Sequence, residues 1–240
     1  MKNKIKVLLM LLLTIFIVLV IYNTTQTNTP KPKKPEKIII PVSEVVEYNY
    51  EEYINNLKTS YNNNDIVGVV QIPNVLEEVV VQTKDNDYYL KHDIHGNYDE
   101  NGTSFLDYRN NIRESKKLLI YGHSDPYGIL PFVKLTNYNE KKFMEDNPYV
   151  YIIDKDGKRK YEVFSSYIET KDFDYVNLES FSGLTYKEHL NKLKKKSFVK
   201  HDIDLTDDSK VLVLQTCSFD ERVSAKTKFQ IVVAKEIDNN

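Results

Sequence analysis

The chain of 240 residues contains a single cysteine, Cys217, at the end of a short apolar run, VLVLQTC over residues 211–217. A cysteine without an intramolecular disulfide partner is an inert core thiol, an intermolecular link or a reactive nucleophile. Cys217 lies where a strand pattern gives way to the polar residues 218–221, whereas core cysteines usually lie mid-strand. Its position alone leaves nucleophile and core filler equally open.

A cysteine becomes a thiolate at neutral pH only beside a base or a cation, so the five histidines are the next candidates. His123 follows the strand pattern of residues 117–121 and Gly122. Glycine lets the backbone turn, so a histidine just beyond a strand end is well placed to project into a site. The alternative is a loop histidine that is bonded to Asp125.

The other histidines suggest less chemistry. His189, in a lysine-rich helical pattern, and His201, in a polar turn, are predicted to be surface residues. His92 and His95 flank two residues of a polar loop and would form at best a weak metal pair. With a single cysteine beside them, no metal site and no cofactor are predicted.

The sequence predicts that the strands and helices that position Cys217 and His123 lie outside the cell. Three lysines precede an apolar run over residues 7–21 that only Thr14 interrupts, a length at the short end for crossing a bilayer. The positive charge before it predicts an N-terminus inside and the rest outside. A cleaved signal peptide is the alternative, but the bulky VIY before Asn23 offers no small-residue cleavage site. We therefore expect a membrane signal anchor over residues 1–22.

Composition limits the possible partners and suggests one domain. The net charge of −2 gives no support for a nucleic-acid partner. An exported chain without a disulfide-capable pair is typical of Gram-positive bacteria. Residues 23–41 include PKPKKP at 30–35 and predict an extended extracellular linker. Residues 42–240 then form the folded domain.

Short strand patterns dominate that domain. Residues 154–157, DKDG, mark a hairpin turn between two of them. Many strands with mostly short turns predict a mostly β fold, a closed or nearly closed barrel rich in antiparallel pairs. The expected strands cover residues 66–72, 78–82, 117–121, 149–153, 160–168, 211–214 and 229–234.

Helical periodicity predicts peripheral helices. Residues 43–61 indicate one or two helices before the first strand, and residues 140–145 a brief one. Residues 185–196 are amphipathic, begin with a capping box of Thr185 and Glu188, and end in lysines. This last helix is inserted before the cysteine strand, and such insertions often shape a binding groove.

Taken in order, these segments resemble the sortase family, and class B sortases in particular. LQTC ending at Cys217 is similar to the TLxTC-type strand of sortases, and YGH ending at His123 to their histidine segment. GTSFLDYRN over residues 102–110 resembles the GxxFxDYRN segment of class B. Further similar segments are residues 68–73 and 85–90, resembling the opening strands of the barrel, and residues 143–151, 172–175 and 185–196, resembling class B.

The resemblance implies a sortase-like closed barrel and a cysteine transpeptidase of the cell surface. The Cys217 thiolate would attack the carbonyl after threonine in a C-terminal sorting signal, an Asn-Pro-x-Thr-like signal in class B, and form a thioacyl-enzyme. His123 would protonate the leaving amine and later deprotonate the incoming one. Gln215, Thr216 and Lys228 would contact substrate. The implied partners are surface proteins with a sorting signal, an amine of the peptidoglycan precursor or cross-bridge, and the membrane through the N-terminal helix.

The third residue of the family is an arginine, thought to bind substrate carbonyls and stabilise the oxyanion. At the usual position of this arginine, ten residues after the cysteine, this sequence has Thr227 instead. Three interpretations are open. Arg222, the only arginine after Cys217, reaches the site if the loop is rearranged. Otherwise Lys228 replaces the arginine, or the site lacks a strong donor. A lysine cannot make a planar two-pronged contact, which slightly favours Arg222. The alternative for Arg222 is a solvated loop charge beside acidic residues 220–221.

Two other functions stay open. A pilin-polymerising sortase would use a lysine amine as acceptor, but the class B-like helix before Cys217 and the lack of an obvious Asp-Pro lid segment argue against it. An exported β-barrel binding module would leave Cys217 purely structural. Cleavage of a peptide that is lost with Cys217 distinguishes the enzyme from the binding module.

Overall fold

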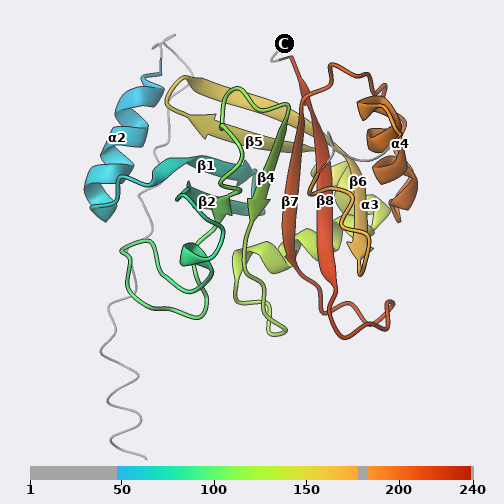
Figure 1. The fold of residues 1–240 in the computed structure, drawn as a ribbon, viewed down its shortest axis with the longest axis horizontal. Helices are drawn as coiled ribbons and strands as arrows, with labels where there is room; N and C mark the ends of the chain where they lie inside the picture. Colours follow the sequence, from blue (N-terminus) through green and yellow to red (C-terminus); the bar gives the residue numbers. More distant parts are fainter. Residues whose placement is uncertain (1–47, 178–182, 239–240) are drawn as a thin grey trace, which may run out of the picture. The chain divides into compact units, whose positions relative to one another are not determined.

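A computed structural model describes residues 48–177 and 183–238 of the chain. In these residues eight strands close into a barrel in the order β1-β2-β3-β4-β7-β8-β6-β5 (Figure 1). The strands are β1 (Ile66–Ile72), β2 (Leu76–Val81), β3 (Phe105–Leu106), β4 (Lys117–Tyr121), β5 (Tyr149–Asp154), β6 (Gly157–Glu169), β7 (Val211–Cys217) and β8 (Phe229–Ile237). The helices are α2 (Tyr50–Tyr61), α3 (Lys141–Asp146) and α4 (Tyr186–Lys196), with 3-10 helices η1 (Tyr88–Leu90) and η2 (Pro131–Asn139).

The pairing of β4 with β7 is the feature of the barrel that matters for chemistry. These two strands run parallel from Lys117 beside Val211 to Tyr121 beside Gln215, whereas most other pairs are antiparallel. Parallel neighbours end at the same edge of a sheet. The loops that follow β4 and β7 accordingly lie at one end of the barrel, at the bottom of Figure 1.

The continuous apolar run of β7 follows from burial on both faces. Leu212 and Leu214 belong to the cluster that fills the barrel interior. Val211 and Val213 belong to a second cluster on the outside, which includes Leu190 of α4. A strand that is covered on both faces carries apolar residues at every position and not at every second one.

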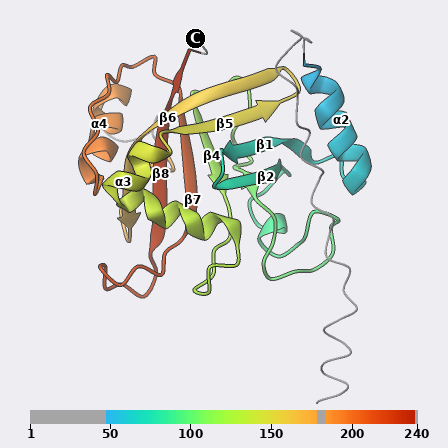
Figure 2. The ribbon, with the colours of Figure 1, turned by 180° about the vertical axis from the view of Figure 1, so that it is seen from behind.

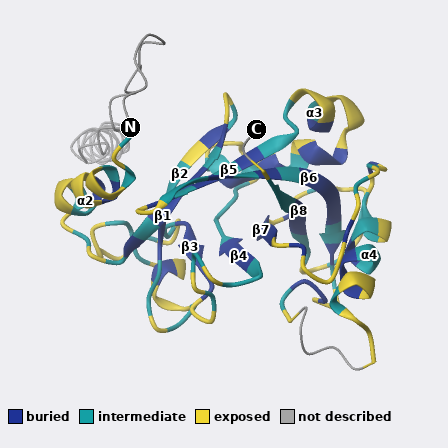
Figure 3. Cartoon of the chain, turned by 90° about the horizontal axis from the view of Figure 1, so that it is seen from above, coloured by how far each residue is buried: buried dark blue, intermediate teal, exposed yellow. Residues whose placement is uncertain are grey.

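The helices cover the outside of the barrel. α2 packs over β1 and β5 and begins after Asn49, whose side chain accepts a hydrogen bond from the Glu52 amide. α4 lies on the opposite side of the barrel (Figure 2) and contacts β6. Its capping box of Thr185 and Glu188 is confirmed. Buried residues follow the strands and the inward helix faces (Figure 3).

The expected closed barrel with peripheral helices is confirmed, and two local predictions are wrong. Residues 85–90 do not form a strand, because the Asp85 carboxylate accepts hydrogen bonds from the amides of Asp87 and Tyr88 and bends the chain into η1. His189 is not a surface residue; it is only 1% exposed, because the face of α4 that carries Leu193 packs on the barrel.

The N-terminal predictions fall on residues that the structure does not describe. The signal anchor at 1–22 and the linker at 23–41 lie outside the described residues, as does the start of the helical stretch from residue 43. From Tyr48 onward the chain forms one compact unit. Within the described ranges, no helix has the length and apolar character to cross a membrane.

Candidate active site

The parallel register of β4 and β7 brings the segments that carry His123 and Cys217 to the same end of the barrel. Tyr121 pairs with Gln215, and the Gly122 amide donates to the Gln215 carbonyl at 3.0 Å, so the backbone segment that carries His123 leaves the barrel next to the segment that ends at Cys217. Adjacent strands lie about 4.8 Å apart, which sets the scale of this separation. The Ser124 hydroxyl donates to the Cys217 carbonyl at 2.6 Å. This hydrogen bond joins the segments that follow β4 and end β7.

Cys217 is the last residue of β7, and its side chain is exposed. Its backbone pairs with Phe229, the first residue of the neighbouring strand β8. Although solvent reaches the residue, the protein packed around it raises the pKa of the thiol above its ordinary value. The resting thiol therefore keeps its proton at neutral pH.

His123 is half-buried beyond the end of β4, and burial lowers the pKa of its imidazole. The Leu90 carbonyl and the Asp99 carboxylate favour the protonated ring and oppose that effect only in part. The lowered pKa of His123 and the raised pKa of Cys217 both favour a resting pair of neutral imidazole and neutral thiol.

This resting state predicts the pH dependence of thiol alkylation. Because burial raises the pKa of the Cys217 thiol, its alkylation by iodoacetamide should accelerate through neutral pH and reach half its maximal rate at a higher pH than that of an unperturbed cysteine. Intact-mass measurements across a pH series report this thiol alone, since the chain has no other cysteine. A half-maximal rate near neutral pH would instead show a resting thiolate–imidazolium pair.

The loop between β4 and η2 is organised by Asp125. Its carboxylate accepts hydrogen bonds from the amides of Tyr127 at 2.7 Å, Ile129 at 2.9 Å and Leu130 at 2.5 Å. These bonds lower the pKa of Asp125, the Leu130 amide most of all. Asp125 is thus engaged with its own loop, and no hydrogen bond in the described residues joins it to His123.

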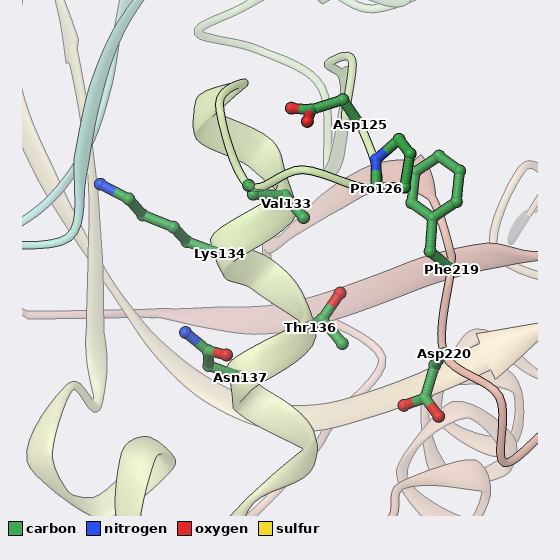
Figure 4. A pocket seen from close by; sticks show the side chains of 9 residues that line it. Asp125, Pro126, Val133, Lys134, Thr136, Asn137, Phe219 and Asp220 are labelled. Atoms are coloured by element: carbon green, nitrogen blue, oxygen red, sulfur yellow. The ribbon is translucent and has the colours of Figure 1, made fainter.

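A pocket of about 440 Å³ opens beside this loop. Its walls come from the residues after His123, from η2 and from the start of the β7–β8 loop. Figure 4 shows Thr136 of η2 pointing toward the side of the pocket that carries Phe219 and Asp220. The walls begin two residues beyond each member of the Cys–His pair, so the pocket adjoins the candidate site.

Arg222 lies in the β7–β8 loop with its guanidinium bound to acidic side chains. Nε donates to Asp220 at 2.9 Å, and Nη1 donates to Glu140 at 3.1 Å. The guanidinium carbon also lies 5.1 Å from the centre of the Phe198 ring. Arg222 therefore has no described contact with Cys217, and its guanidinium is held by Asp220 and Glu140.

Lys228 lies at the base of the same loop, next to the start of β8. Its ammonium donates to the Val223 carbonyl at 2.9 Å and to the Asp220 carbonyl. Its own carbonyl accepts a hydrogen bond from the Ser218 amide at 2.9 Å. Lys228 is thus the residue opposite the first position after Cys217, and its charge holds the loop together.

Comparison with known proteins decides the family. The chain is 30% identical over 177 residues to sortase B of Staphylococcus aureus (strain NCTC 8325 / PS 47), covering 73% of this chain and 71% of that protein. It is 32% identical over 160 residues to sortase B of Listeria monocytogenes serovar 1/2a (strain ATCC BAA-679 / EGD-e), covering 65% of this chain and 63% of that protein. The chain belongs to the sortase B family. No protein-family model matches it.

Solved sortase B structures share the barrel. A mutant form of Clostridium perfringens sortase B superposes with a TM-score of 0.69 at 29% identity, covering 78% of this chain and 87% of that one. The Staphylococcus aureus sortase B–substrate complex also gives 0.69, at 27% identity, covering 81% and 88%. The class B resemblance and the fold expected from it are confirmed.

The class B segment at residues 102–110 supports β4 in this sortase. Asp107 is fully buried and accepts hydrogen bonds from Arg109 at 2.8 and 2.7 Å and from the Tyr121 hydroxyl at 3.0 Å. Burial opposes the charge of Asp107, but the bonds from Arg109 outweigh it and hold the pKa at about 2. The ionised carboxylate thereby fixes Tyr121, two residues before His123.

The two predicted substrate contacts of β7 have different surroundings. Gln215 is half-buried, and its side-chain oxygen accepts a hydrogen bond from the Tyr175 hydroxyl at 2.8 Å. Thr216 is only 2% exposed. Sequence reasoning noted residues 172–175 for their class B resemblance but gave Tyr175 no role. It also gave none to Ser124, whose only signal is that it follows His123.

The other histidines outside α4 have their own partners. His92 is half-buried and His95 is exposed, and each contacts a backbone carbonyl near its loop, whereas His201 contacts a carboxylate. The contacts are His92 Nδ1 to Tyr88 O at 2.7 Å, His95 Nδ1 to Tyr61 O at 3.1 Å, and His201 Nε2 to Glu162 Oε1 at 3.0 Å.

Proposed function

We propose that this sortase B family protein is a transpeptidase that cleaves a C-terminal sorting signal after threonine and transfers the new carboxyl group to a peptidoglycan amine. The observation that supports the proposal is the parallel register of β4 and β7, which brings the segments that carry His123 and Cys217 to the same end of the barrel. Related solved structures support it. One is a Staphylococcus aureus sortase B–substrate complex, and another is sortase B complexed with triglycine.

The chemistry needs two residues and one covalent intermediate. His123 takes the proton of the Cys217 thiol, and the sulfur attacks the threonine carbonyl carbon. A C–S bond forms, the peptide C–N bond breaks, and the leaving amine takes the proton from His123. An incoming amine then attacks the thioester and gives its proton to His123. The C–S bond breaks, a new amide remains, and the sulfur regains the proton.

We further propose that the reaction takes place outside the cell, at the membrane. The support is in the sequence, where the apolar run of residues 7–21 follows three lysines. An anchor over residues 1–22 would hold the domain on the face where sorting-signal proteins and peptidoglycan precursors meet.

Product analysis tests the proposed function. The full chain in detergent micelles is incubated with a peptide that contains an Asn-Pro-x-Thr signal, with and without triglycine, and the products are separated by chromatography. We expect cleavage after threonine in both cases and a triglycine-linked product when the amine is present. Cleavage at another bond, or no cleavage by a folded protein across a panel of sorting-signal peptides, contradicts the proposal.

The third residue is tested by three variants in the same assay. We expect Arg222→Ala to slow acylation by about 10²-fold, the effect of losing one oxyanion donor. Lys228→Ala should slow it less, because the Lys228 ammonium already binds loop carbonyls. Arg222→Lys keeps the charge without the two-pronged contact and should be intermediate. If neither alanine variant slows acylation, both assignments are wrong.

A further inference from the structure

The loop between β2 and β3, residues 82–104, passes over one edge of the His123 ring. Gly102 stands in this loop with φ of 56°, in the left-handed region that favours glycine. A Cβ atom built on Gly102 would overlap the Tyr89 carbonyl oxygen and would lie 2.9 Å from both His123 Nε2 and the Leu90 carbonyl oxygen. Only a residue without a side chain lets the backbone approach the imidazole this closely.

The loop backbone is held in place by its own hydrogen bonds. The Gly102 amide donates to the Asp99 carbonyl at 3.0 Å, and the Thr103 amide donates to the Tyr89 carbonyl at 3.0 Å. The Thr103 hydroxyl donates to the His92 carbonyl at 3.0 Å. Residues 89–103, named the histidine wall here, therefore cannot move aside without breaking several bonds.

The histidine wall makes the two nitrogens of His123 unequal. Nε2 is buried and has no hydrogen-bond partner among the described residues, whereas Nδ1 is not a buried atom without a partner. The Leu90 carbonyl lies close enough to favour the protonated ring even so. A carbonyl beside a ring nitrogen selects the tautomer that carries its hydrogen there.

We propose that the histidine wall keeps the neutral hydrogen of His123 on Nε2 and leaves Nδ1 as the nitrogen that exchanges a proton with Cys217, with Gly102 as the positioning residue. The inference rests on the proposed function. The Nδ1 lone pair accepts the thiol proton, and the same N–H bond breaks when the proton passes to the leaving amine. Nε2 keeps its hydrogen throughout.

Nitrogen NMR of the histidine rings tests the tautomer directly. The full chain is labelled at its five histidines, and the His123 signals are assigned as those lost in His123→Gln. We expect the neutral ring to show a protonated Nε2 and an unprotonated Nδ1. A neutral ring that carries its hydrogen mainly on Nδ1 overturns the proposal. The spectrum does not depend on peptide cleavage, so it decides this inference even if the proposed function fails.

Gly102→Ala and Gly96→Ala form a matched pair. Both glycines lie in the histidine wall with positive φ, 56° and 80°, but a Cβ on Gly96 would meet only the Tyr88 hydroxyl, at 3.2 Å. We expect Gly102→Ala to lower kcat about 10²-fold, the cost of a misplaced catalytic group, with KM little changed and the His123 ring signals shifted. Gly96→Ala also places a side chain at positive φ and should keep the kcat and ring signals of the wild type.

Wild-type kcat and ring signals in folded Gly102→Ala overturn the role of Gly102, as does an equal loss of kcat in Gly96→Ala. Thermal unfolding and circular dichroism establish that both variants fold. If Gly102→Ala does not fold, the tautomer of the wild-type ring decides the inference alone.

Discussion

Replacing Cys217 by alanine is expected to abolish peptide cleavage and amine transfer while the barrel stays folded. No other thiol exists in the chain, so no residue can take over the nucleophilic step. Loss of a covalent nucleophile costs about 10⁴-fold or more in kcat. The side chain is exposed at a strand end, and the change should alter the free energy of unfolding by less than about 0.5 kcal/mol.

Chromatography of the peptide products measures the loss of cleavage and transfer, and thermal unfolding measures whether the variant stays folded. Cys217→Ser is the closest matched control, since it keeps the size and hydrogen-bonding ability of the side chain but not the acidity of a thiol. We expect it to be inactive as well. Cleavage by Cys217→Ala above the uncatalysed rate would mean that another group performs the reaction.

Replacing His123 by alanine is expected to slow both acylation and transfer by roughly 10²–10⁴-fold, the usual contribution of a positioned general acid and base. Because burial lowers the pKa of His123, the wild-type ring is neutral and ready to accept the thiol proton at neutral pH. Without it the thiol must lose its proton to solvent. The variant's residual rate should therefore keep rising with pH toward the raised pKa of Cys217.

Single-turnover acylation and triglycine transfer across a pH series measure the two effects. Added imidazole should restore part of the lost rate, which loss of structure alone would not allow. His95→Ala is the matched control, because His95 is exposed and, within the described residues, its ring forms a hydrogen bond only with the Tyr61 carbonyl. Its rate should equal that of the wild type. A His123→Ala variant as fast as His95→Ala would remove His123 from the mechanism.

Much of the barrel could be predicted from local patterns. β1 and β4 have the predicted bounds, because their apolar residues are bounded by turn residues. β3 could not be predicted, because two residues, Phe105–Leu106, carry no periodicity. The strand expected at residues 85–90 failed because Asp85 bonds to nearby amides, a local interaction that competes with extended structure.

The candidate site was predictable in its residue types and not in its geometry. The positions of Cys217 and His123 after strand patterns are visible in the sequence, but the parallel pairing of β4 with β7 depends on the closure of the whole barrel. Of the two acidic partners of Arg222, Asp220 is close to it in the sequence, whereas Glu140 is distant. The sequence around Gly102 also does not reveal which side chain this glycine approaches in the fold.

The most direct test of a thioacyl mechanism is the intact mass of the full chain, quenched in acid soon after mixing with a sorting-signal peptide. We predict a mass increase equal to the acyl half of the peptide, mapped by digestion to Cys217, released by hydroxylamine and missing in Cys217→Ala. Product formation by the wild type with no adduct under rapid quenching, or an adduct on any other residue, would contradict the mechanism.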